Sequence, residues 1–264
     1  MKEIISNISE FIRLKICIFV CAIGMSGFLL FNPLNMSLVF VSLTSFLVAA
    51  GAYSLNNIRD VKEDRINRKK INPLVFSDKA LPIILICFSI GIFFSFFLSL
   101  YSILFSLVGT IISIHYSFFK LKKHFLIKNL YTGFGVSVVF LVGAISVNIE
   151  VVWYYFLISF FAVIISMISD LRDYKGDKIN FIKTLPVSLG YDVTKNLIFL
   201  LIGLFSFLIL FFSNLFILLP FVFIMLYFLY KNNPSSAHSF AGYSLVFLVF
   251  WLLIGSVNYV YGNV

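Results

Sequence analysis

The chain has 264 residues, of which 61% are hydrophobic and only 12% are charged. That composition excludes a water-soluble globular domain and indicates an integral membrane protein. The formal net charge is +9, but the basic residues gather in a few loops, so we expect no nucleic-acid partner.

Apolar runs long enough to cross a bilayer recur along the whole chain. The segment before them, MKEIISNISEFIRLK, is amphipathic and is expected to form a short helix at the membrane interface. We predict a single all-α membrane domain over residues 1–264, with nine transmembrane helices around a central cavity. The expected spans are about 10–31, 36–56, 81–99, 102–118, 129–147, 151–169, 194–212, 214–230 and 240–260.

All twenty Lys and Arg residues fall in the N-terminal segment or in alternate loops, with Lys128 in the loop before the fifth span. Because positive charge marks the cytoplasmic side of membrane proteins, we expect the N-terminus inside the cell and the C-terminus outside. The sequence therefore predicts a multi-pass protein of the plasma membrane, in contact with membrane lipids.

The end of the second predicted span is unusually polar. In the stretch NNIRDVKEDRIN, Asn56, Asp60 and Asp64 are spaced four residues apart and so share one face of a helix. Carboxylates at that spacing repel each other, and ionisable groups at a membrane helix end are costly. A divalent cation removes both costs, and ligands made only of oxygen suit Mg²⁺.

The same stretch occurs a second time. Residues 169–187, SDLRDYKGDKINFIKTLPV, align without gaps on residues 56–74, which lie 113 positions earlier, and eight residues are identical. Asp173 and Asp177 repeat the spacing of the first copy, and Asp170 lies one turn earlier. Both copies follow an even-numbered span, so both are expected on the cytoplasmic side. Two such clusters with basic residues among them predict a diphosphate site bridged by two Mg²⁺ ions.

These stretches resemble the motifs of the UbiA-type intramembrane prenyltransferases. NNIRDVKEDRINR is similar to the family's N-D-x-x-D-x-x-x-D motif, and DLRDYKGDKINFIKTLPVSLG to its second motif, D-x-x-D-x-x-G-D followed by K-T-L-P. YSFFKLKKHFLIKNLYTGFG resembles the tyrosine-and-lysine loop after the fourth span. The second motif looks most like the branch that adds a geranylgeranyl group to geranylgeranylglyceryl phosphate in archaeal-type ether lipid synthesis.

The resemblance implies a reaction, partners and site residues. A prenyl group passes from an allylic prenyl diphosphate donor to a lipid-like phosphorylated acceptor, and two Mg²⁺ ions stabilise the leaving diphosphate. Each basic residue of the site has lipid headgroup contact as its alternative role. The implied metal ligands are Asn56, Asp60, Asp64, Asp170, Asp173 and Asp177, and Asp60, Asp64, Asp173 and Asp177 are also counted as catalytic. The implied substrate-binding residues are Arg13, Arg65, Arg68, Tyr116, Lys120 and Lys178.

The chain departs from the family pattern at three places, which leaves the acceptor open. Asn57 stands where the first motif usually has Asp, Phe181 stands where Gly is common, and KKINPLVFSDKA replaces the usual R-P-[IL]-x-x-G-x loop. An aromatic prenyltransferase acting on 4-hydroxybenzoate or another quinone precursor is the first alternative. A cation-coupled secondary transporter with two repeats is the second, although transporter sites usually lie near mid-membrane.

Overall fold

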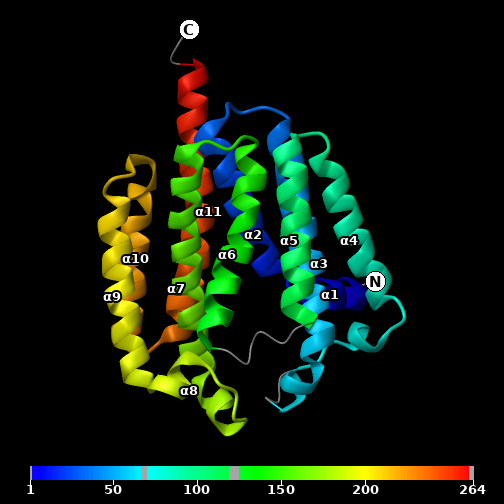
Figure 1. Ribbon diagram of the computed structural model, residues 1–264, viewed down its shortest axis with the longest axis vertical. Helices are drawn as coiled ribbons and strands as arrows, with labels where there is room; N and C mark the ends of the chain where they lie inside the picture. Colours follow the sequence, from blue (N-terminus) through cyan, green and yellow to red (C-terminus); the bar gives the residue numbers. More distant parts are fainter. Residues whose placement is uncertain (1, 67–69, 119–124, 262–264) are drawn as a thin grey trace. The chain divides into compact units, whose positions relative to one another are not determined.

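The computed structural model describes residues 2–66, 70–118 and 125–261, and the regular structure within these ranges is entirely helical. The all-α prediction is therefore confirmed for this part of the chain. The elements (Figure 1) are α1 (Lys2–Phe11), α2 (Leu14–Phe31), α3 (Ser37–Ile66), η1 (Pro73–Phe76), α4 (Ala80–Ser95), α5 (Leu100–Phe118), α6 (Phe125–Ala144), α7 (Ile149–Ile179), α8 (Leu185–Leu189), α9 (Tyr191–Ile209), η3 (Ser213–Leu218), α10 (Leu219–Tyr230) and α11 (Pro234–Tyr261).

Each predicted span coincides with a helix, but two of these helices are short for a bilayer. α4 has 16 residues, which rise about 24 Å at 1.5 Å per residue, whereas the hydrocarbon core is about 30 Å thick. α10 has 12 residues and is preceded by a 3₁₀ turn. Within the described ranges, seven helices are thus shown to be candidate spans, and nine spans stay a prediction. The seven are Leu14–Phe31, Ser37–Val61, Leu100–Phe118, Ile127–Ala144, Ile149–Ile179, Tyr191–Ile209 and Pro234–Gly255.

The predicted start of the first span, near residue 10, is too early. α1 ends at Phe11 and α2 begins only at Leu14, because Arg13 between them has a φ of 54°. A right-handed helix cannot continue through a residue in the left-handed region. The separate N-terminal helix is confirmed, and its position at a membrane interface stays a prediction.

Contacts divide the chain into two compact units. Unit 1 comprises residues 1–28, 35–120 and 138–147, and unit 2 comprises residues 29–34, 121–137 and 148–264. The first copy of the repeated motif lies at the end of α3 in unit 1, and the second lies at the end of α7 in unit 2. Each unit therefore contains one carboxylate cluster.

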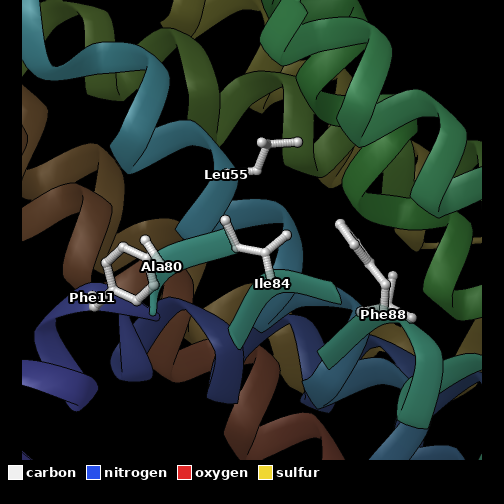
Figure 2. Close-up of a cluster of buried hydrophobic side chains, with 6 residues drawn as sticks. Phe11, Leu55, Ala80, Ile84 and Phe88 are labelled. Carbon is white, nitrogen blue, oxygen red and sulfur yellow. The ribbon is translucent and has the colours of Figure 1, made fainter. Parts of the chain in front are cut away.

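In unit 1, α4 and α5 both contact α3 (Figure 1). Phe11, at the end of α1, belongs to a buried apolar cluster with Leu55 of α3 and three residues of α4. Figure 2 shows this cluster, whose labelled members are Phe11, Leu55, Ala80, Ile84 and Phe88. Because Leu55 immediately precedes Asn56, the cluster fixes the chain at the start of the first motif.

In unit 2, α7 contacts α9 and α11, and α10 contacts α11. The rings of Phe161 on α7 and Phe205 on α9 are stacked, with centroids 4.8 Å apart. A Cβ on Gly133 of α6 would lie 2.8 Å from the backbone nitrogen of Val163, so α6 and α7 can approach closely only with glycine there. These contacts fix the helix that carries the second motif.

Candidate active site

The side chains of the first motif lie on the last turns of α3. Asn56, Asp60 and Asp64 are all partly buried, and α3 remains helical through Ile66. The shared helix face predicted for them is therefore confirmed. Ser117 Oγ of α5 lies 2.5 Å from Asn56 Oδ1 and donates a hydrogen bond to it. This contact orients the amide oxygen of the predicted ligand.

Asn57 joins the first motif to the start of α2. Its Nδ2 donates to the Phe11 carbonyl oxygen at 2.6 Å, and its Oδ1 accepts from Arg13 Nε at 2.8 Å. An ionised Asp could accept from Arg13, but it has no proton to donate to a carbonyl. The contacts therefore explain why an amide suits this chain where the family motif usually has Asp.

Other cations lie near the ends of α3 and α5. Arg59 Nε donates to the Ser117 carbonyl oxygen at 3.4 Å, and its guanidinium lies 4.5 Å from the Phe118 ring centroid. Arg65 is exposed on α3, and Tyr116 is partly buried on α5. Two further predicted substrate-binding residues, Arg68 and Lys120, lie outside the described residues, so their role stays a prediction.

The carboxylate pair of the second motif lies on α7. Asp177 is only 7% exposed, whereas Asp173 is partly exposed and accepts hydrogen bonds from Nε and Nη2 of Arg172, at 3.0 and 3.1 Å. An ion pair that solvent reaches contributes little to stability. Asp173 can therefore exchange Arg172 for another cation at low cost. Lys178 Nζ lies 5.7 Å from the centroid of the Tyr174 ring, on the same helix.

Asp170 has a different environment from the other carboxylates. It is 2% exposed, and its Oδ1 is ion-paired with Lys128 Nζ. Its Oδ2 accepts from Asn129 Nδ2 at 2.9 Å, and Ser166 Oγ donates to Asn129 Oδ1 at 2.5 Å. We predicted Lys128 in a loop, whereas it lies on α6, and the sequence pattern did not indicate Asn129 or Ser166 as site residues. A Lys-Asn pair at the start of an apolar run was the only sequence signal for this network.

α7 ends at Ile179 in a Schellman turn that begins at the Asp177 carbonyl. Ile182 N donates to the Asp177 carbonyl oxygen at 2.9 Å, and Phe181 N donates to the Lys178 carbonyl oxygen at 3.4 Å. Phe181 has a φ of 55° and is 91% exposed. Glycine usually fills this position of the turn because a Cβ is strained there. The backbone thus explains the glycine that is common at this point of the family's second motif.

The loop after the first motif is attached to α1. Asn72 donates to the Asn7 carbonyl oxygen at 2.7 Å and also caps η1 by accepting from Leu74 N at 2.9 Å. Lys70 pairs with Glu10 at 3.1 Å. The departure from the usual family loop therefore comes with its own set of contacts.

The donor set suits magnesium. Among the residues that the structure describes, no group of three or more His, Cys, Asp or Glu side chains is placed to hold a metal ion. Mg²⁺ needs fewer protein ligands, because it usually takes one or two carboxylates and completes its shell with water and substrate phosphate. The pairs Asp60/Asp64 and Asp173/Asp177 each meet that requirement. That both pairs act on one diphosphate stays a prediction.

Comparison with known proteins establishes the family. The model of the UbiA prenyltransferase family matches residues 14–254. The chain therefore belongs to the UbiA prenyltransferase family. Its family, together with the seven helices of the described residues that are long and apolar enough to cross a membrane, makes it a multi-pass membrane protein.

Two curated relatives carry the name digeranylgeranylglyceryl phosphate synthase. The one from Methanococcus aeolicus is 30% identical over 209 residues, which cover 74% of this chain and 71% of that protein. The one from Sulfurisphaera tokodaii is 27% identical over 168 residues, which cover 60% of this chain and 59% of that protein. The matched segment thus spans less than two thirds of the second relative's length.

A solved structure shares the fold. A UbiA homolog from Archaeoglobus fulgidus, bound to GPP and Mg²⁺, superposes with a TM-score of 0.72 over 94% of this chain and 98% of that one, at 14% identity. At so low an identity the match establishes the fold alone.

Proposed function

We propose that this protein transfers a prenyl group from an allylic prenyl diphosphate to an acceptor in the membrane. The observation that carries the proposal is the repeated carboxylate pair, Asp60/Asp64 on α3 and Asp173/Asp177 on α7, at the ends of two long apolar helices. The Archaeoglobus fulgidus homolog bound to GPP and Mg²⁺ supports this assignment.

We assign the first pair, together with Asn56, to one Mg²⁺ ion and the second pair to another. When bound, Mg²⁺ neutralises the charge that develops on the leaving diphosphate as its C–O bond breaks. The protein's own contribution is to fix the ligands. Ser117 orients the Asn56 amide, and the Schellman turn closes on the Asp177 backbone carbonyl.

Four described residues of the predicted site are assigned to the substrates. Arg13, Arg65 and Lys178 supply positive charge toward phosphate oxygens, and a guanidinium carries five N–H donors, of which Arg13 uses its Nε on Asn57. Tyr116 supplies an aromatic face, which would stabilise the allylic cation that forms as the diphosphate leaves.

Geranylgeranylglyceryl phosphate is the acceptor that we propose, with geranylgeranyl as the transferred group. The names of the curated relatives support it. The fixed cation at Arg13 supports it too, since a phosphorylated acceptor needs a cation that an aromatic acid does not. We also propose nine spans in the plasma membrane, with the N-terminus and both motifs cytoplasmic and the C-terminus outside.

The test uses purified protein in detergent with Mg²⁺ and labelled geranylgeranyl diphosphate. Geranylgeranylglyceryl phosphate and 4-hydroxybenzoate are offered in parallel. We expect label in the glyceryl phosphate only, and none after Mg²⁺ is removed with a chelator. Asp60→Asn and Asp173→Asn should each slow transfer roughly 100-fold, because each removes charge that binds the metal. Asp192→Asn, at an exposed carboxylate on α9 outside both motifs, should leave the rate unchanged.

The outcomes separate the alternatives. Transfer to 4-hydroxybenzoate alone would keep the chemistry and replace the acceptor. No transfer to either acceptor, with cation-coupled solute uptake into proteoliposomes, would identify a transporter and refute the proposal.

A further inference from the structure

Asn57 and Asp170 occupy the same position in the two copies of the motif. They are 113 residues apart, and each stands three residues before the first carboxylate of its pair and seven before the second. One is a neutral amide and the other an acid. Their contacts are nevertheless of the same kind, because each side chain binds a cation from the beginning of the preceding long helix.

In unit 2 that cation is Lys128, in the first turns of α6. With Lys128 on Oδ1 and Asn129 on Oδ2, both oxygens of the Asp170 carboxylate are bonded within the protein. The carboxylate is also almost completely buried. The partly buried ammonium of Lys128 beside Asp170 repels any second cation that approaches the same oxygen. The remaining lone pairs of Asp170 lie beside that ammonium, and giving up the ion pair would leave the buried Asp170 charge uncompensated.

In unit 1 the cation is Arg13, just before the first residue of α2. The Asn57 amide bonds Arg13 through its oxygen and the Phe11 carbonyl through its nitrogen. Ser54 Oγ, one turn earlier on α3, lies 3.5 Å from the same carbonyl oxygen. This position therefore ties the motif helix to the chain at the Arg13 break, where the backbone has the left-handed φ described above.

We propose that residues 57 and 170 are anchoring positions and not metal ligands. Each fixes its motif helix against the start of the preceding helix, and so sets the place of the carboxylate pair that follows. Arg13 and Lys128 are the positioning residues that complete the anchors. Asp170, predicted from the sequence as a metal ligand, thus becomes an anchoring residue. The inference that neither residue binds the metal rests on the proposed function, whereas the inference that each residue anchors its helix does not.

The first experiment is a stability cycle in detergent without metal or substrate. Asp170→Asn removes the carboxylate charge that bonds Lys128 directly, and Lys128→Met leaves the buried Asp170 carboxylate without its paired cation. Each single variant should lower the unfolding midpoint by roughly 6 °C or more. The double variant removes both charges and should be more stable than either single variant. If only the double variant yields folded protein, that outcome also shows that the charges of Asp170 and Lys128 are coupled, and more strongly so.

The second experiment measures Mn²⁺ binding by electron paramagnetic resonance in the presence of diphosphate, alongside the Mg²⁺ concentration that gives half-maximal transfer. Asp170→Asn should weaken both quantities clearly less than Asp173→Asn does, since it removes no ligand, and its main effect should be a lower maximal rate. Asp173→Asn is the matched control and should weaken both by about tenfold or more, as expected when a ligand is lost.

Two results would overturn the proposal. One is a double variant no more stable than the single variants, which would show that Lys128 and Asp170 are not coupled. The other is a loss of Mn²⁺ binding in Asp170→Asn as large as that in Asp173→Asn. A different pattern, in which the cycle shows coupling but Asp173→Asn binds Mn²⁺ normally, would support the anchor and refute the proposed function.

Discussion

Replacing Phe181 by glycine is expected to stabilise the protein. Phe181 has a φ of 55°, and with 91% of its surface exposed it loses almost no packing when truncated. The left-handed conformation costs a residue with a Cβ about 1–2 kcal/mol. Glycine avoids this cost, but it gives the unfolded chain more conformational freedom, which lowers the free energy of unfolding by about 0.5–1 kcal/mol. The net gain in the free energy of unfolding is about 0.5–1 kcal/mol.

Ile179→Gly is the matched control. Ile179 is another large apolar residue, 76% exposed, but it belongs to α7, where glycine costs about 0.5–1 kcal/mol. Thermal unfolding in detergent should move the midpoint up by about 1–3 °C for Phe181→Gly and down by a similar amount for Ile179→Gly. If both variants lose stability equally, the strain at Phe181 is not what the backbone indicates, and the reasoning fails.

Two further substitutions, each with a control substitution, test the packing of the described helices. Gly143→Ala should abolish folding or lower the unfolding midpoint strongly, because its Cβ would lie 1.9 Å from the Gly24 carbonyl oxygen. The control is Gly203→Ala on α9, whose Cβ would meet nothing within 4 Å. It should be neutral or slightly stabilising in the same assay. Phe11→Ala should cost about 3–5 kcal/mol, because Phe11 is completely buried in its cluster. Phe76→Ala, at a ring that is 63% exposed, should cost less than 1 kcal/mol in a parallel denaturation series.

The helices were predictable because their signal is local. A run of apolar residues long enough for a bilayer is visible in the sequence, and so is a four-residue spacing of carboxylates on a helix. The ends of the helices were less predictable. The break at Arg13 depends on one backbone angle, and no glycine or proline marks it. α4 ends at Ser95 although Phe96 and Phe97 continue the apolar run.

The role of each polar residue was the least predictable part of the site. Asp170 has the same chemistry and almost the same spacing as Asp173, and only its neighbours distinguish it. Lys128 is 42 residues from Asp170 in the chain, and their pairing follows from how α6 lies against α7. No pattern in the sequence alone gives that contact. Because Lys128 follows other lysines in the sequence, we assigned it to a basic loop, although it belongs to a helix.

Because residues 57 and 170 have different partners, the two copies of the motif are not interchangeable. A segment copied from the first half into the second would bring an amide to Lys128, and the reverse graft would set a carboxylate oxygen against the Phe11 carbonyl, 2.6 Å from the present amide nitrogen. The carboxylate pairs of the two copies have one common form, whereas the residues that hold them differ.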